Sequence, residues 1–156
     1  MASPLIQGAV VQFSDQYAGD VESAQAYERL TKSKNTVLID VRTRAEWNFV
    51  GVPDLSEIGK EVLLVEWQSF PPAPPVTEFA AGLSALLAQQ GFDQETELYF
   101  LCRSGQRSQS AAIALTQAGY GKCFNVSGGF EGSLDQKNHR GTQSGWKAAG
   151  LPWVQS

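Results

Sequence analysis

The sequence has few of the features that mark exported, membrane or disulfide-bonded proteins. Its 156 residues include only two cysteines and one histidine, and no lysine or arginine precedes Arg29. Two cysteines without the basic start of a signal peptide argue against a disulfide scaffold and favour a reducing compartment. No apolar run approaches the ~20 residues that span a bilayer. We therefore expect a cytoplasmic protein with no membrane partner.

Basic residues are also scarce. The chain holds 12 Lys and Arg against 16 Asp and Glu, which gives a net charge of -4. General nucleic-acid binding requires a basic face, so we expect no nucleic-acid partner. The length fits one domain, which would bury roughly 70% of its extended surface. We assign residues 1–19 to an N-terminal arm and residues 20–156 to a single domain.

Apolar runs alternate with helical patterns along the rest of the chain. The runs typical of buried strands cover residues 36–41, 61–67, 97–102 and 122–126. Helical periodicity over 77–91 and 109–119 separates them. Residues 8–13 could form an edge strand or an extended arm, and Asp20 or Ser23 is typical of a helix cap. The alternation predicts an α/β fold with a parallel sheet and helices on both faces.

One stretch combines features that favour chemistry. Cys102 ends an apolar run, and a short polar loop separates it from a helical pattern. The free N–H groups at a helix start attract anions, Gly105 permits a tight turn, and Arg103 and Arg107 add positive charge. In such places the pKa of a thiol falls from ~8.5 toward ~4–7. We therefore predict a reactive thiolate rather than a buried strand cysteine beside solvated arginines.

Three segments together resemble the rhodanese-type sulfurtransferase family. Residues 102–107, CRSGQR, resemble its active-site loop. Residues 38–42 with Glu46 and Trp47 resemble its N-terminal signature, and its C-terminal signature resembles residues 125–130, Trp146 and residues 150–153. The resemblance covers about residues 20–153 and implies a rhodanese-like three-layer fold. In that fold a central parallel sheet of about five strands is flanked by helices on both faces.

The resemblance also implies a reaction. Cys102 would take a sulfane sulfur from a small anionic, thiosulfate-like donor, carry it as a persulfide and pass it to cyanide, a thiol or a protein. The residues that would bind the donor are Arg103, Ser104, Gly105, Gln106 and Arg107. We expect no cofactor and no metal, and a monomer or weak homodimer.

Asp40 and Arg42 are supporting candidates. They could set the geometry of the loop or the field at the strand ends. Alternatively they are structural, with Arg42 paired to Glu46 at helical spacing. The residues alone leave both interpretations open.

His139 and Cys123 are weaker candidates for chemistry. A Cys–His hydrolase would need His139 to reach the thiol as a base, but its polar loop predicts an exposed side chain. Cys123 opens a strand whereas Cys102 closes one, so the two lie roughly 15 Å apart along the strand direction. Because a disulfide needs Cα atoms within ~7 Å, we expect Cys123 to be a core thiol.

Two other functions remain open. A phosphatase or arsenate reductase would need a longer Cys-x5-Arg loop, whereas Cys102 and Arg107 have Cys-x4-Arg spacing. A non-catalytic binding or regulatory module would bind through the Pro-rich residues 70–75 or the Trp-bearing tail. Residues 54–76 look like an insertion, which either shapes the entrance above Cys102 or only packs.

Overall fold

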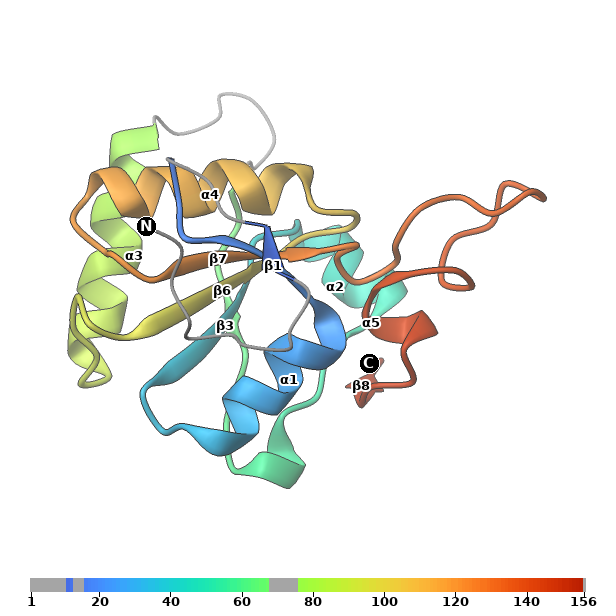
Figure 1. The fold of residues 1–156 in the computed structure, drawn as a ribbon, viewed down its shortest axis with the longest axis horizontal. Coiled ribbons are helices and arrows are strands. Elements are labelled where there is room, and N and C mark those ends of the chain that lie inside the picture. The colour runs from blue at the N-terminus through green and yellow to red at the C-terminus, as the bar shows by residue number, and fades with distance from the viewer. Residues whose placement is uncertain (1–10, 13–15, 68–75, 156) are drawn as a thin grey trace.

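A six-stranded sheet forms the centre of the computed structural model, which describes residues 11–12, 16–67 and 76–155 (Figure 1). Across the sheet the strands are β1 (Val11–Gln12), β2 (Gly19–Glu22), β7 (Cys123–Ser127), β6 (Glu97–Leu101), β3 (Thr36–Asp40) and β5 (Leu63–Leu64). All neighbours from β2 to β5 are parallel, and only β1 is antiparallel. The predicted five-stranded parallel sheet is therefore confirmed.

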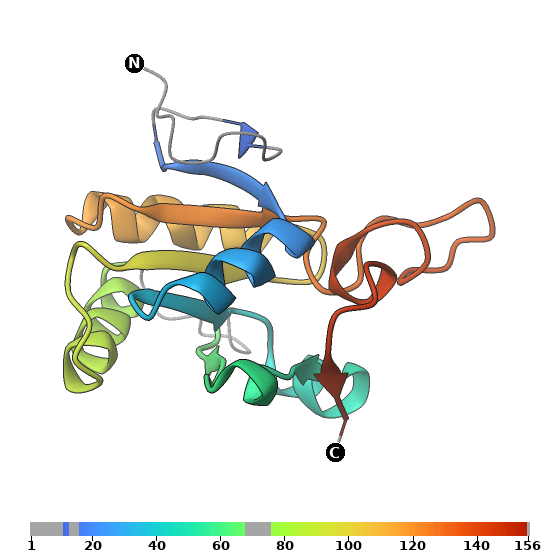
Figure 2. The same cartoon turned by 60° about the horizontal axis from the view of Figure 1, so that its bottom comes forward.

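Helices cover both faces of this sheet, as predicted. On one face α3 (Val76–Gln89) packs on α4 (Gln106–Gln117), and α4 packs on β6 and β7. On the other face α1 (Ser23–Lys32) contacts β2, β3, β7 and α5 (Gly145–Ala148). Figure 2 shows α1 in front of the strands and α4 behind them.

The connection from β3 to β5 and the C-terminal end form a smaller unit beside this sheet. It contains α2 (Arg44–Val50), the 3-10 helix η2 (Ser56–Ile58) and the antiparallel strands β4 (Val52–Pro53) and β8 (Trp153–Val154). The Pro-rich segment 70–75 lies outside the described residues. Among the helices that the structure describes, none is long and apolar enough to cross a membrane.

Strand β6 shows why its sequence is continuously apolar. Leu98, Phe100 and then Cys102 join the core cluster that includes α3 and α4 residues. Tyr99 and Leu101 join the cluster that contains α1 and α5 residues. Because side chains alternate between faces and both faces are covered, every position from Leu98 to Leu101 is buried.

The first helix begins with a cap that the sequence patterns did not predict. Asp20 lies in strand β2, and α1 starts at Ser23 after Glu22, so neither Asp20 nor Ser23 is the N-cap. Residues 19–22 are drawn into the sheet because they pair with β7, with Val21 fully buried. They supply the fifth parallel strand. The division into an arm, 1–19, and a domain, 20–156, stays a prediction.

Strand ends bring distant segments together at one edge of the sheet. Asp40, the last residue of β3, pairs in register with Leu101, the last residue of β6. The N–H of Val41 donates to Leu101 O at 2.8 Å, and that of Phe130, beyond β7, donates to Cys102 O at 2.8 Å. Residues beyond three neighbouring strands therefore meet where parallel α/β sheets bind ligands.

Candidate active site

Cys102 lies between the end of β6 and the first residue of α4. Its Sγ accepts a hydrogen bond from the Gly105 N–H at 3.1 Å and lies 3.2 Å from the Ser108 hydroxyl oxygen. Gly105 is the N-cap of α4 with φ 113°, a conformation that favours glycine. Cys102 itself is only 1% exposed. The thiol is therefore held at the positive end of α4 with one backbone donor aimed at it.

The segment after β7 holds the backbone of the loop from the other side. Cys102 O accepts from Phe130 N, and Arg103 O accepts from Glu131 N at 2.9 Å and from Gly132 N at 3.1 Å. Gly129 has φ +63°, and a Cβ there would collide with Cys102 O and lie 2.6 Å from the Arg103 carbonyl carbon. Gly129 of the C-terminal signature thus allows a backbone-to-backbone contact with the loop, whereas its neighbour Gly128 lies against Gly145.

Arg107 is tied to helix α2. Its guanidinium forms two hydrogen bonds with the Glu46 carboxylate, at 2.7 and 2.9 Å. Glu46 also accepts from Thr43 N at 3.1 Å, as the second half of a capping box at the start of α2. Burial opposes the charge of Glu46, but the hydrogen bonds from Arg107 and Thr43 outweigh it and lower its pKa to about 2. Hydrogen bonding to Glu46 raises the pKa of Arg107, although burial of the guanidinium opposes this effect.

The alternative in which Arg42 pairs with Glu46 is wrong, because Glu46 pairs with Arg107 instead. Arg42 binds Asp40, with 2.6 Å from Nη2 and 3.0 Å from Nε, and both side chains are 0% exposed. Its Nη2 also donates to Gly51 O at 2.8 Å, and its guanidinium lies 4.3 Å from the centre of the Phe130 ring. Arg42 lies two residues beyond the end of β3 and folds back onto Asp40, whereas Glu46 binds Arg107 of the loop. The pair joins the end of β3 to α2 and to the segment beyond β7.

The remaining loop side chains form the rim. Arg103, Ser104 and Gln106 are exposed. Within the described residues Arg103 makes no ion pair, so its charge is available to an anion that approaches Cys102.

Sequence reasoning missed the polar side chains beneath the thiol. Ser108 is fully buried and donates to Asn125 Oδ1 at 2.6 Å, and Asn125 donates to Asp20 Oδ1 at 2.9 Å. Asn125 is part of the C-terminal signature, and Ser108 directly follows the loop. Those positions were the available signal, but nothing in the sequence joins them to Asp20.

Cys123 and His139 lie where the patterns predicted. Cys123 is fully buried, pairs in register with Leu98, and lies near Tyr120 O at 3.5 Å. Burial raises the pKa of its thiol to about 12, so it is a core thiol rather than a second reactive cysteine. His139 is exposed. Among the described residues no group of His, Cys, Asp and Glu could hold a metal ion.

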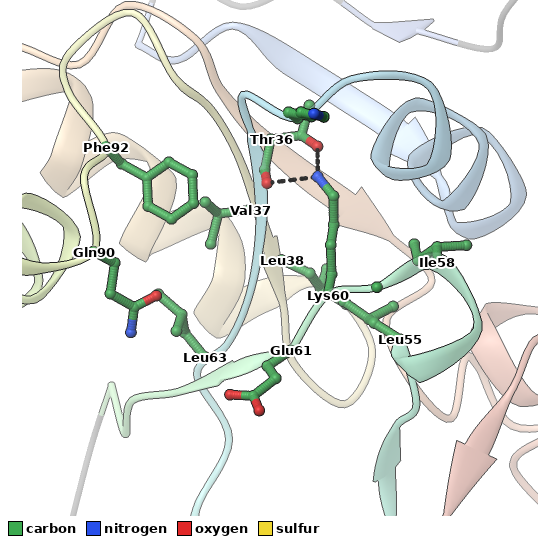
Figure 3. A pocket seen from close by; sticks show the side chains of 12 residues that line it. Thr36, Val37, Leu38, Leu55, Ile58, Lys60, Glu61, Leu63, Gln90 and Phe92 are labelled. Carbon is green, nitrogen blue, oxygen red and sulfur yellow. Dashed lines mark hydrogen bonds between the residues drawn. The ribbon is translucent and has the colours of Figure 1, made fainter.

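A cavity of about 460 Å³ lies beside the start of β3 (Figure 3), at the opposite end of the sheet from the thiol. Its wall includes Thr36, at the start of β3, whereas Cys102 follows the end of the parallel neighbour β6. The Lys60 ammonium in this cavity donates to the carbonyl and hydroxyl of Thr36 and to Ser33 O. The Lys60 ammonium is therefore engaged with the fold, and it lies at the other end of the sheet from the thiol.

The parallel sheet, the cysteine loop on α4 and the crossing segment after β7 together define a rhodanese-like domain. Comparison with known families agrees with this class. The protein-family model described as the STR4 middle domain matches residues 19–156. The chain therefore belongs to this rhodanese-like family.

Individual proteins show the same relationship. The chain is 37% identical over 131 residues to the uncharacterized protein RC0915 of Rickettsia conorii, which covers 84% of the chain and 93% of that protein. The crystal structure of Rv0390 from M. tuberculosis is 46% identical with a TM-score of 0.77, over 90% of this chain and 99% of that one.

Two more distant relatives have informative names. The chloroplastic protein THYLAKOID RHODANESE-LIKE of Oryza sativa subsp. indica is 28% identical over 155 residues, 99% of the chain but 29% of that protein. A protein of Allochromatium vinosum named Sulfurtransferase is 26% identical over 110 residues, 70% of the chain and 82% of that protein. The rhodanese resemblance of the sequence is thereby confirmed.

Proposed function

We propose that the protein is a sulfurtransferase that carries a sulfane sulfur on Cys102 as a persulfide. The observation that carries this proposal is the Gly105 N–H aimed at Cys102 Sγ, 3.1 Å away, at the first turn of α4. Backbone donors at a helix N-terminus stabilise a sulfur anion. A relative named Sulfurtransferase supports the reaction class.

The reaction needs two displacements on sulfur. The Cys102 thiolate attacks the outer sulfur of thiosulfate, the sulfur–sulfur bond of the donor breaks, and sulfite leaves with the electron pair. The persulfide then carries the negative charge on its terminal sulfur. An acceptor attacks that atom, and cyanide, for example, leaves as thiocyanate while the Cys102 thiolate returns.

The two loop arginines have different parts in this proposal. Arg103 is exposed at the rim and meets the dianionic donor directly. Arg107, already bound to Glu46 on both nitrogens, fixes the loop and contributes its charge from a distance. The backbone from Arg103 to Arg107, with Ser104, Gly105 and Gln106, surrounds the transferred sulfur.

The engaged Arg107 also disfavours a phosphatase or arsenate reductase. Such an enzyme needs the loop arginine to point at the oxyanion, whereas here Glu46 occupies the guanidinium. A non-catalytic module has no comparable reason to keep a buried cysteine with an N–H aimed at its sulfur.

The proposal includes the setting of the reaction. Cys102 and Cys123 are both free thiols, which suits a reducing, cytoplasmic compartment. The acceptor is a thiol or a protein, and we expect a monomer or weak homodimer.

Intact-mass spectrometry tests the proposal. Incubation with thiosulfate should add the mass of one sulfur atom, and cyanide should remove it as thiocyanate. Cys102→Ser should gain no sulfur, whereas Cys123→Ser, which changes the core thiol, should still gain it. Absence of the adduct with every sulfane donor tried would refute the proposal.

A further inference from the structure

The hydroxyl of Ser108 has only one hydrogen, and that hydrogen points away from Cys102. It is donated to Asn125 Oδ1 at 2.6 Å, while the Ser108 oxygen lies 3.2 Å from Cys102 Sγ. The oxygen therefore faces the sulfur with a lone pair. In this arrangement Ser108 can accept a hydrogen from the thiol but cannot donate one to the thiolate.

Asp20 determines which way the Asn125 amide points. Asn125 Nδ2 donates to Asp20 Oδ1 at 2.9 Å, and a carboxylate can only accept. The amide nitrogen must therefore face Asp20, so the amide oxygen faces Ser108. The two residues lie opposite each other in the register of β2 and β7, and Asn125 is only 5% exposed. The pairing of the strands thus fixes this contact.

Tyr17 holds the carboxylate in place. Its hydroxyl donates to Asp20 Oδ1 at 2.9 Å and accepts from Gln109 Nε2 of α4 at 2.8 Å. Burial, together with Asp20, raises the pKa of Tyr17 against the opposing effect of Gln109, so the hydroxyl keeps its hydrogen. We call Tyr17, Asp20, Ser108, Gln109 and Asn125 the Asp20 network.

We propose that Asp20 and Asn125 are positioning residues that set the hydrogen-bonding state of Cys102 through Ser108. Two neighbours of the sulfur then act in opposite directions. The Gly105 N–H favours the thiolate, whereas Ser108, held as an acceptor, favours the thiol. The balance between them sets how reactive the sulfur-free enzyme is.

The consequence for sulfur transfer rests on the proposed function. A persulfide has no hydrogen on Sγ, so it cannot donate to Ser108, and the contact favours the sulfur-free thiol instead. After the acceptor takes the terminal sulfur, the thiolate accepts a proton from the acceptor or from water and regains the bond to Ser108. The Asp20 network therefore favours delivery of the sulfur over its retention.

Alkylation of Cys102 by iodoacetamide tests the positioning role without any sulfur donor. Asn125→Ala removes the acceptor of the Ser108 hydrogen without changing charge, and Asp20→Asn lets the Asn125 amide turn over. In both variants Ser108 becomes free to donate to Sγ. We expect alkylation at neutral pH to be about fivefold faster, the effect of one net hydrogen bond, and the ultraviolet absorbance of the thiolate to rise.

Glu22→Gln is the matched control, because it removes one negative charge from the same strand at an exposed position. Its alkylation rate should equal that of the original protein. Thermal unfolding of each variant identifies any that fails to fold, in which case Asn125→Ala or Asp20→Asn alone carries the comparison.

A double-mutant cycle separates hydrogen bonding from simple charge removal. Loss of the Asp20 charge would favour the thiolate in any background, whereas the effect through Ser108 needs the hydroxyl. We therefore expect Asp20→Asn to change alkylation only slightly when combined with Ser108→Ala. An equal effect with and without Ser108, or no effect of Asn125→Ala, would overturn the inference.

The two proposals fail in different ways. If no donor produces a persulfide but the variants alkylate faster, the sulfurtransferase proposal fails and the positioning role stands. If the persulfide forms but the variants alkylate at the original rate, the sulfurtransferase proposal stands and the positioning role fails.

Discussion

Glu46 shows how one carboxylate connects two elements at the scale of single residues. It completes the capping box of α2 and binds both nitrogens of Arg107, which lies 61 positions away in the sequence. An Arg–carboxylate pair with two hydrogen bonds fixes orientation as well as distance. The start of α4, and with it the cysteine loop, is therefore attached to α2.

The low pKa of Glu46 predicts how stability depends on pH. Its pKa falls from 4.5 to about 2 on folding, so it stabilises the fold above pH 4.5 and loses that contribution as the pH drops toward 2. Glu46→Gln should lower the free energy of unfolding by about 1 kcal/mol at neutral pH. The difference between the variant and the original protein should disappear as the pH approaches the lower pKa. Chemical unfolding across this range measures it, and a constant difference would contradict the expected cause.

Measurements of kinetics and of thermal stability should distinguish the roles of the two loop arginines. Arg103 is exposed and unpaired within the described residues, so Arg103→Ala should raise the KM for thiosulfate about tenfold, as expected for one lost charge-assisted contact, with little change in Tm. Arg107→Ala removes the partner of Glu46 and should lower Tm as well as slow persulfide formation. Equal effects of the two substitutions on both quantities would show that the arginines share one role.

At the scale of elements, the crossing of the cysteine loop by the segment after β7 depends on Gly129. Gly129→Ala forces a Cβ against Cys102 O and the Arg103 carbonyl, so the loop or the crossing segment must move. We expect a loss of stability of several kcal/mol and little or no persulfide formation. Circular dichroism and intact mass follow the two effects.

Gly150→Ala is the control for this substitution. Gly150 has a similarly positive φ, +74°, but nothing lies within 4 Å of a Cβ there. It should cost about 1 kcal/mol of backbone strain and leave persulfide formation unchanged. If Gly150→Ala also abolished persulfide formation, crowding at the loop would not explain the effect expected of Gly129→Ala.

The elements that the sequence predicted well are those whose signal is local. The apolar run before Cys102, the glycine of the loop and the amphipathic pattern of α3 each identify themselves within a few residues. Strand β2 did not, because Asp20 to Ser23 also fits a helix start, and its partner β7 is about a hundred positions away.

Side-chain partners were harder to predict than elements. Arg42 had two carboxylates within reach along the sequence, and only the path of the backbone after β3 decides for Asp40. Ser108, Asn125 and Asp20 come from three elements, so their contact is a product of strand order. Local patterns contain no information about that order.

At the scale of the whole molecule, the C-terminal segment closes the smaller unit around α2. Strand β8 pairs with β4, and Pro152 O accepts from the indole of Trp146 at 2.7 Å and from Asp54 N at 3.0 Å. Lys147 Nζ donates to Val50 O at 2.9 Å, at the end of α2. The helix that presents Glu46 is thus held by residues at the far end of the chain.

Removal of residues 152–156 should therefore affect the distant loop. The indole of fully buried Trp146 would lose its acceptor, and β4 would lose its partner strand. We expect Tm to fall by about 5–10 °C and persulfide formation to slow. A shortened protein with unchanged Tm would show that the segment only lies on the surface.

The depth of Cys102 has a consequence for which compounds can react there. A cysteine that is 1% exposed is reached most easily by a small reagent or by an atom at the tip of a slender group. The outer sulfur of thiosulfate has that shape, as does cyanide, whereas the sulfurs of a protein disulfide or a bulky peroxide are flanked by substituents. Under the proposed function, we therefore expect the loop to favour terminal sulfur over the sulfurs of protein disulfides and over bulky oxidants.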